Sequence, residues 1–171
     1  LTDSNFNSLL FGSNTSFTIS LADYNGGNPV PNGNTITLNK TQLQENPVHL
    51  VTTITEGSNK IGYLMYNQFS ATFDGQLNDA FAALKAENIT DLVIDLRYNG
   101  GGSVRTATYL GAMVTGQFDG QLFSREVWNQ KVQNVLDQED FDNNFTNQIN
   151  NGAINEPINN LNLNRVYFIT T

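Results

Sequence analysis

Three consecutive glycines, Gly100, Gly101 and Gly102, could provide backbone N–H groups that bind a ligand or take part in a reaction. They follow the apolar run 91–96 and precede an apolar-periodic stretch at 103–114. Without a Cβ atom, glycine can turn its N–H groups outward, and the start of a helix adds further donors for an anion. Two chemistries use such a device: phosphate binding, and an oxyanion hole for acyl transfer. A tight strand-to-helix turn without chemistry is the plain alternative, and the motif alone leaves it open.

Phosphate binding is the weaker of the two chemical interpretations. The spacing is not G-x-G-x-x-G, and no Gly-Lys-Ser/Thr follows the glycines. A nucleotide-binding α/β domain therefore has little support beyond the glycines themselves.

Other reactive residue types have structural explanations. Ser103 is expected to be the N-cap of the following helix, and His49, the only histidine, is expected to be a strand residue. Lys60 is expected to be solvated. Asp95 lies inside an apolar strand, which is costly unless the carboxylate is paired, so we expect a bond with Arg97 or with the backbone.

Metal and cofactor sites are not expected. The chain has no Cys and one His, whereas a metal site needs two or three such ligands. The acidic run 137–142 lacks the D-x-D-x-D-G pattern of a calcium loop, and a solvated surface explains it better.

Periodicity places the glycines within an α/β framework. The first part of the chain predicts a helix over 2–11, capped by Thr2 or Asp3 and ended by Gly12, strands at 17–21 and 35–38, and a turn region at 24–34. A domain boundary is expected near Glu45, before the breaking Pro47.

The second part predicts alternating strands and helices. Strands are expected at 49–54, 61–69, 91–96, 122–128 and 166–169, and helices at 74–87 and 103–114. The 74–87 helix has an apolar stripe and begins with Asp74, an acid favoured there by the helix dipole. The run 91–96 is expected to be a central parallel strand. Residues 137–164 are expected to be a surface excursion with a short helix near 141–149. The fold class is α/β, layered.

Composition excludes some partners. The net charge is −8, and the eight Lys and Arg residues are scattered, so nucleic acid and anionic membrane surfaces are unlikely ligands. No apolar run is long enough for a membrane-spanning helix. The chain starts at Leu1 without a signal-like segment, so we expect a processed chain or a piece of a longer one.

The order of these motifs resembles a known family. The segments Ile61-Gly62-Tyr63 to Phe69, and Asp95-Leu96-Arg97-Tyr98-Asn99 with the three glycines after it, resemble the "IGY…F" strand and "DLR-N-(P/G)-G-G" loop of the C-terminal processing (tail-specific) serine peptidases. The match covers 61–114 well. Residues 166–171 resemble the strand that runs into that family's Ser-Ala-Ser-Glu nucleophile segment. Residues 1–45 resemble, more loosely, the second half of its PDZ domain.

The resemblance implies a serine peptidase in which a lysine is the general base. It assigns Gly100, Gly101 or Gly102 to the oxyanion hole and gives positioning roles to Arg97 and Asn99. It implies residues 1–45 as part of a PDZ-like module and 46–171 as the first part of the catalytic domain.

The resemblance also implies that the nucleophile and the base lie outside these 171 residues, so the chain alone is expected to be inactive. The expected partners are peptide or protein C-termini, and missing segments of its own parent chain or another copy. An extracytoplasmic location is implied, and no cofactor. A non-catalytic peptide-binding or scaffold module is the competing interpretation.

Overall fold

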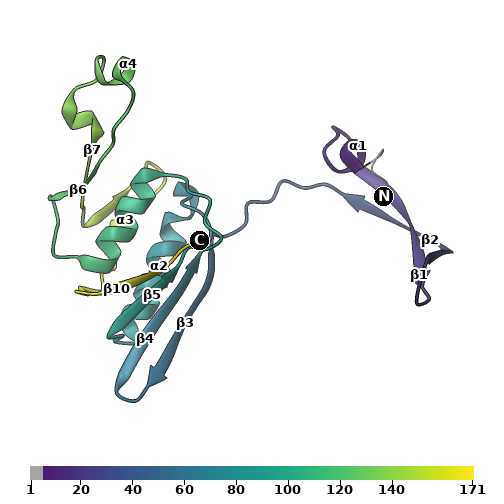
Figure 1. The fold of residues 1–171 in the computed structure, drawn as a ribbon, viewed down its shortest axis with the longest axis horizontal. Helices are drawn as coiled ribbons and strands as arrows, with labels where there is room; N and C mark the ends of the chain where they lie inside the picture. The colour runs from purple at the N-terminus through teal and green to yellow at the C-terminus, as the bar shows by residue number, and fades with distance from the viewer. Residues whose placement is uncertain (1–5) are drawn as a thin grey trace. The chain divides into compact units, whose positions relative to one another are not determined.

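The computed structural model describes residues 6–171, apart from the side chain of Gln138. The chain divides into two compact units, one ending at Glu45 and the other spanning Asn46–Thr171. Figure 1 labels most of their helices and strands.

The first unit is a helical turn and a long hairpin. Its elements are α1 (Phe6–Leu10), β1 (Ser16–Tyr24) and β2 (Pro29–Asn39). β1 and β2 pair antiparallel, with a register shift between Ser20 and Ala22. The expected cap of the first helix at Thr2 or Asp3 lies outside the described residues.

The turn predicted over 24–34 is wrong in length, because residues from Pro29 onward already belong to β2. Pro29 and Pro31 pair with β1. Proline lacks a donor but is tolerated in an edge strand, and both strands of a two-stranded ribbon are edges. The Asn32 side chain donates to Asp23 across the ribbon at 2.9 Å, which extends the pairing into the predicted turn.

The second unit is a four-stranded sheet with order β10-β5-β4-β3. Its strands are β3 (Val48–Glu56), β4 (Asn59–Tyr66), β5 (Asp91–Asp95) and β10 (Val166–Ile169). β5 lies between β4 and β10 and is parallel to both. The prediction of a central parallel strand is therefore confirmed.

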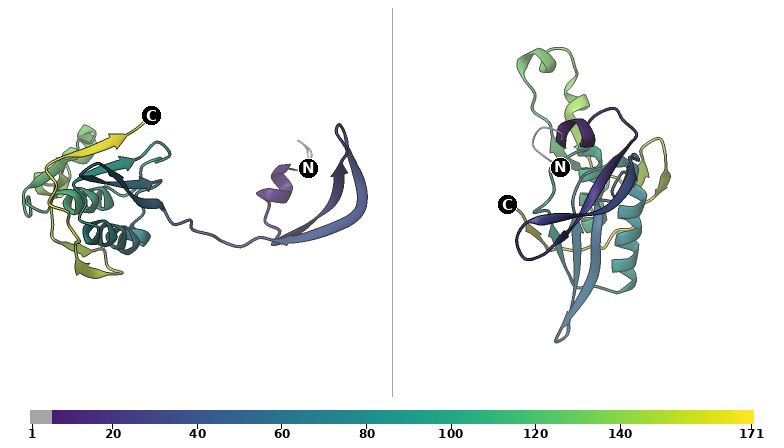
Figure 2. Two further views of the ribbon diagram at one scale, coloured as in Figure 1. Left: turned by 90° about the horizontal axis from the view of Figure 1, so that it is seen from below. Right: turned by 90° about the vertical axis from the view of Figure 1, so that its right-hand side faces the viewer.

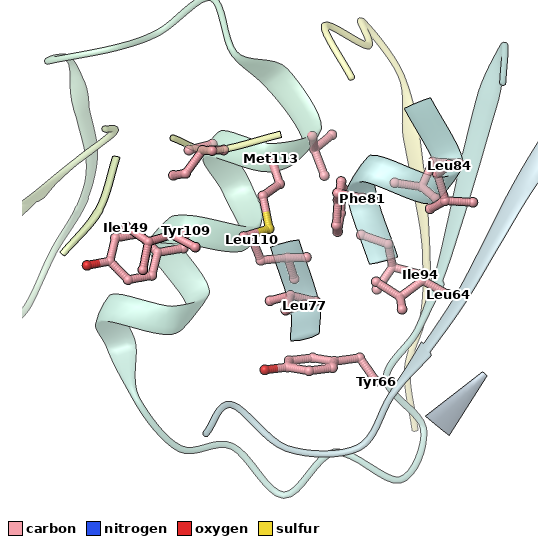
Figure 3. Close-up of a cluster of buried hydrophobic side chains, with 14 residues drawn as sticks. Leu64, Tyr66, Leu77, Phe81, Leu84, Ile94, Tyr109, Leu110, Met113 and Ile149 are labelled. Atoms are coloured by element: carbon pink, nitrogen blue, oxygen red, sulfur yellow. The ribbon is translucent and has the colours of Figure 1, made fainter. Parts of the chain in front are cut away.

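Two helices cover one face of this sheet. They are α2 (Asp74–Ala86), preceded by the 3₁₀ turn η1 (Ala71–Phe73), and α3 (Val104–Thr115). Figures 1 and 2 show α2 and α3 beside each other and against the sheet. The predicted stripe of α2, together with β4, β5 and α3, forms the core seen in Figure 3; its fully buried members include Leu64, Leu77, Phe81, Leu92, Ile94 and Met113.

Two small ribbons complete the unit: β6 (Leu122–Arg125) with β7 (Asp142–Asn144), and β8 (Gln148–Asn150) with β9 (Asn155–Pro157). Short helical turns lie between β6 and β7, namely α4 (Gln130–Gln133) and η2 (Gln138–Phe141). The strand predicted at 122–128 therefore ends three residues early.

The helix predicted near 141–149 is wrong, because β7 and β8 occupy this segment. Phe141, Phe145 and Ile149 have helical spacing, but they lie in or beside short strands. Ile149 is fully buried in the main core and Phe145 packs against that core with Phe118 and Phe123, while Phe141 is buried outside it. Asparagine side chains also compete for backbone partners in this segment and disfavour a helix.

Candidate functional site

The glycine loop lies at the carboxyl edge of the parallel strands. The Leu96 N–H donates to the Ile169 carbonyl at 2.8 Å, so the ends of β5 and β10 are held together. The Asn99 N–H then bonds the Leu96 carbonyl at 2.9 Å and turns the chain toward the glycines. Loops at this edge are the usual ligand-binding position of parallel α/β sheets.

The backbone requires glycine at two of the three positions. Gly101 has φ of 102° and Gly102 has φ of 137°, conformations that other residues rarely adopt. A Cβ on Gly102 would stand 2.1 Å from the Phe69 carbonyl oxygen.

This closeness comes from a pairing of the glycine loop with Phe69. The Phe69 N–H donates to the Gly101 carbonyl at 3.0 Å, and the Ser103 N–H donates to the Phe69 carbonyl at 2.8 Å. The strand predicted at 61–69 ends at Tyr66, and Phe69 instead forms an isolated bridge with Gly102.

Asn99 fixes the conformation of the loop with both ends of its amide. Its Nδ2 donates to the Tyr66 carbonyl at 3.0 Å, and its Oδ1 accepts the Gly101 N–H at 2.8 Å. The Gly101 N–H is therefore already bonded. Within residues 6–171, the N–H groups of Gly100 and Gly102 have no such partner and are left for a ligand.

Arg97 and Asp95 form an ion pair beside the loop, as expected, in which the carboxylate is buried and the arginine side chain is half exposed. Asp95 is fully buried and accepts from the Arg97 Nε at 3.0 Å, from its Nη2 at 2.6 Å and from its backbone N–H at 3.1 Å. The Tyr63 hydroxyl also donates to Asp95, at 2.7 Å. The Arg97 guanidinium, followed by the Tyr63 hydroxyl, holds the pKa of Asp95 well below its usual range. The bond to Asp95 raises the pKa of Tyr63.

Ser103 is the N-cap of α3, as predicted, because its Oγ accepts the Thr106 N–H at 3.2 Å. His49 lies in β3 and is exposed, also as predicted. Lys60 is partly exposed, in line with the prediction, and its ammonium also forms a surface ion pair with Glu87. That pair lies at the start of β4, away from the loop that follows β5.

A buried acid close to the loop was misjudged from the sequence. Asp74, assigned to the helix dipole alone, is fully buried. It accepts from the Thr106 hydroxyl and from Asn151 Nδ2, both at 2.8 Å. Asn151 also donates to the Ala71 carbonyl at 2.9 Å. Burial raises the pKa of Asp74. No sequence signal indicated the long-range partner Asn151.

The acidic run at 137–142 is partly structural. Asp137 and Asp140 cap η2, and Asp142 is paired with Arg125. Within residues 6–171, no group of three His, Asp or Glu side chains could hold a metal ion. No helix in the same range is both long and apolar enough to cross a membrane.

Comparison with known proteins identifies a family for the second unit. Residues 60–158 match the model of Peptidase family S41. The solved structure of an S41 protease from Bacteroides fragilis NCTC 9343 is 28% identical, with a TM-score of 0.61 over 100% of this chain and 44% of that chain. A photosystem II D1 C-terminal processing protease is 18% identical, with a TM-score of 0.47 over 80% of this chain and 33% of that one. No curated protein matches. The chain thus spans less than half the length of these solved relatives.

Proposed function

The chain belongs to peptidase family S41, and from this premise we propose that it carries one wall of the active site of a serine endopeptidase that cleaves near protein C-termini. The wall is the loop 99–102, and the donors for the oxyanion are the N–H groups of Gly100 and Gly102. The observation that carries the proposal is that Asn99 occupies the Gly101 N–H while those two have no partner within residues 6–171. Preorganised N–H donors at a fixed position stabilise the tetrahedral intermediate of acyl transfer.

The position of β10 supports the rest of the mechanism. Its carboxyl end is bonded to Leu96 beside the loop. In the resemblance described above, the nucleophilic serine follows a strand like β10 and the lysine base lies further on. We propose that this serine attacks the substrate carbonyl, that the lysine takes its proton, and that the oxyanion forms against the glycine loop.

Asn99 and Arg97 are positioning residues in this proposal. Asn99 connects the end of β4 to the loop, and Arg97 is fixed by the buried Asp95. Residues 1–45 are proposed to be part of a PDZ-like module that holds the substrate as an added strand. An extracytoplasmic location is likewise proposed, on the family resemblance.

Partners of the second unit are proposed on its exposed apolar edge strand. Tyr167, Phe168 and Ile169 of β10 are 48%, 53% and 37% exposed, and an open strand edge is a template for further pairing. We propose that segments of the parent chain, or another copy, cover this edge. Sedimentation and amide exchange would together contradict this if the 171-residue chain stays monomeric at high concentration and if, in the parent, the β10 amides that do not bond to β5 exchange freely.

The decisive test uses the full-length protein and peptides with free C-termini. The first serine after β10 that lies in a Ser-Ala-Ser-Glu-like segment is changed to alanine. We expect hydrolysis to fall by roughly 10⁴-fold or more, and we expect the 171-residue chain alone to show none. Peptide binding without hydrolysis by the unmodified full-length protein would favour the non-catalytic interpretation instead.

The oxyanion assignment has its own test. Semisynthesis can replace the N–H of Gly100 or Gly102 by an ester oxygen without adding a side chain. Loss of a true oxyanion donor lowers kcat by roughly 10² to 10³, with little change in KM. If neither replacement lowers kcat, the loop is only a turn.

A further inference from the structure

A polar pocket of about 390 Å³ lies beside α3 and apart from the glycine loop. One wall is the first half of α3, and the others are β7, β8 and the segment between them. Its lining is dominated by amide and hydroxyl groups: Arg105, Thr108, Tyr109, Asp142, Asn143, Asn144, Thr146, Gln148 and Asn150.

The pocket has a cation without a counter-ion. Arg105 makes one hydrogen bond, from Nη1 to the Asn150 carbonyl at 3.3 Å. In the part of the chain that the structure describes, no carboxylate lies within ion-pair distance of its guanidinium, although Arg97, Arg125 and Arg165 all have one. An unpaired arginine is unexpected in a chain of net charge −8.

Tyr109 adds a second donor. Its hydroxyl oxygen accepts the Asn150 N–H at 3.1 Å, which leaves the hydroxyl proton for another acceptor. Figure 3 shows Tyr109 at the border of the core beside Ile149, with its hydroxyl directed away from the other core side chains.

The negative charges near the pocket are already neutralised or bonded. Asp142 lines the pocket, but it is held by Arg125 through two bonds, one of them 2.8 Å from Nη2 to Oδ2. Asp74, which also interacts electrostatically with Arg105, is fully buried, and each of its oxygens accepts a hydrogen bond. Among the described residues that line the pocket, the only unpaired formal charge is therefore the positive charge of Arg105, and the amide groups around it offer both donors and acceptors.

Hydrogen bonds connect the pocket to the glycine loop. Gly102 pairs with Phe69, and Ala71, two residues further on, accepts from Asn151. Asn150, the preceding residue, bonds both Arg105 and Tyr109. Arg105 is also only three residues beyond Gly102, about one helical turn along α3.

We propose that this pocket is a subsite for a carboxylate of the peptide substrate, with Arg105 as the residue that binds it and Tyr109 as a second donor. As a substrate subsite it rests on the function proposed above. Arginine pairs with carboxylates through two parallel N–H bonds, and its free N–H groups fit that geometry. The carboxylate comes either from an Asp or Glu side chain or from the peptide C-terminus.

The test is a titration of the ¹⁵N-labelled 171-residue chain followed by ¹H–¹⁵N NMR. Three probes separate the sources: acetyl-Ala-Ala-Glu-Ala-Ala-amide, its Gln counterpart, and acetyl-penta-alanine with a free C-terminus. We expect one or both carboxylate peptides to shift the signals of Asn150, Gln148 and Arg105, and the Gln peptide to leave them in place.

Arg105→Gln should weaken that binding about tenfold, because it removes the charge from an exposed side chain with a single hydrogen bond. Lys85→Gln is the matched control: it removes the same charge from the last turn of α2 and should change nothing. The proposal is wrong if no carboxylate peptide shifts the pocket signals, if the Gln peptide binds equally well, or if both variants weaken binding alike.

This readout needs no catalysis, so it separates the two proposals. Binding at Arg105 with no hydrolysis by the full-length protein would contradict the proposed peptidase and keep the carboxylate site. If the rate of hydrolysis depends neither on carboxylates in the substrate nor on Arg105→Gln, the carboxylate site is contradicted and the proposed peptidase is kept.

Discussion

Residues 6–45 and Asn46–Thr171 contain the same kinds of element, yet they are stabilised differently. In the first unit the long β1–β2 ribbon is held by its ladder and by exposed side-chain bonds such as Thr18 to Thr37 at 2.7 Å, and none of residues 6–45 is buried. In the second, two helices bury one face of a sheet, and the side chains between them are fully enclosed.

The difference shows where the rigidity of the candidate site comes from. An isolated two-stranded ribbon is marginally stable in water, whereas burial of apolar side chains supplies most of the free energy of folding. The glycine loop extends from the second kind of unit: its neighbours Tyr66 and Ile94 are buried in the core. Hydrogen-bond donors that must keep a fixed position need a rigid, packed core beneath them. A ribbon with an open edge can instead adjust its conformation when a peptide strand pairs with it.

The largest expected effect on stability comes from truncating a side chain in the core of the second unit, compared with truncating one in the β1–β2 ribbon. Phe81→Ala should reduce the free energy of unfolding of the second unit by about 3–5 kcal/mol, because Phe81 is fully buried between α2, α3 and the sheet. Ile19→Ala, which removes one half-exposed cross-strand partner of Ile36, should cost about 1 kcal/mol or less. Urea unfolding, with amide exchange read separately in β4–β5 and β1–β2, measures both. Equal losses would mean that the ribbon has a core of its own.

The next largest effect on stability is expected when alanine replaces one of two glycines that have positive φ. Gly102→Ala should destabilise by about 3 kcal/mol or more, from strain together with the clash against the Phe69 carbonyl. Gly33→Ala in β2, where φ is 82° and the added Cβ meets nothing within 4 Å, should cost only about 1 kcal/mol. Thermal unfolding of the two variants gives the difference. A mild Gly102→Ala would show that the loop and Phe69 can separate easily.

A smaller effect compares two aspartates, each accepting a bond from an asparagine Nδ2. Asp74→Asn would leave one acceptor oxygen for two donors, the Thr106 hydroxyl and Asn151 Nδ2, so one of these two buried bonds is lost or reversed. Asn151 cannot offer its own Oδ1 in exchange, because that atom already accepts from the N–H groups of Ala153 and Ile154. We expect a loss of about 1–3 kcal/mol. Asp23→Asn, opposite Asn32 on the exposed ribbon, should stay within about 0.5 kcal/mol. The midpoints of urea unfolding measure both losses of stability. Similar losses for Asp74→Asn and Asp23→Asn would show that the burial of Asp74 does not matter.

The same contrast explains how far the sequence could predict the molecule. Periodicity located β5, α2 and α3 nearly to the residue, because these elements bury one face or both faces and their patterns record it. β10 was located by its apolar run, although most of its side chains are exposed. It failed at 141–149, where Phe141, Phe145 and Ile149 have helical spacing but lie in or beside short strands, with Phe141 buried outside the main core. It missed Asn151 and Arg105, since partners supplied by distant Asn-rich segments leave no local pattern.

The same distinction between local patterns and long-range contacts applies to the candidate site. The glycine run, the Ser103 cap and the Asp95–Arg97 pair are local, so spacing was enough to indicate them. The assignment of the Gly101 N–H to Asn99 depends on how Tyr66 is presented by β4, which is a long-range result of folding. The sequence therefore left three glycines open as donors where the hydrogen bonds leave two.

The smallest effect is a change in acid sensitivity within the second unit. Because the pKa of Asp95 is lowered by Arg97 and Tyr63, the native state binds fewer protons there than the unfolded state. The stabilisation is present above the unfolded pKa near 4 and is lost as pH falls through the lower native value. Asp95→Asn should therefore be less stable than the wild type at pH 7. Below about pH 4 the difference in the free energy of unfolding should shrink, with a pH dependence that corresponds to at most one proton bound per molecule.

Asp74 has the opposite sign, since burial raises its pKa and its contribution to stability is lost as pH rises. Urea midpoints from pH 2 to 7 for the wild type, Asp95→Asn and Asp74→Asn test both signs, and a gap for Asp95→Asn that is constant with pH would contradict an ionised Asp95 in the native state.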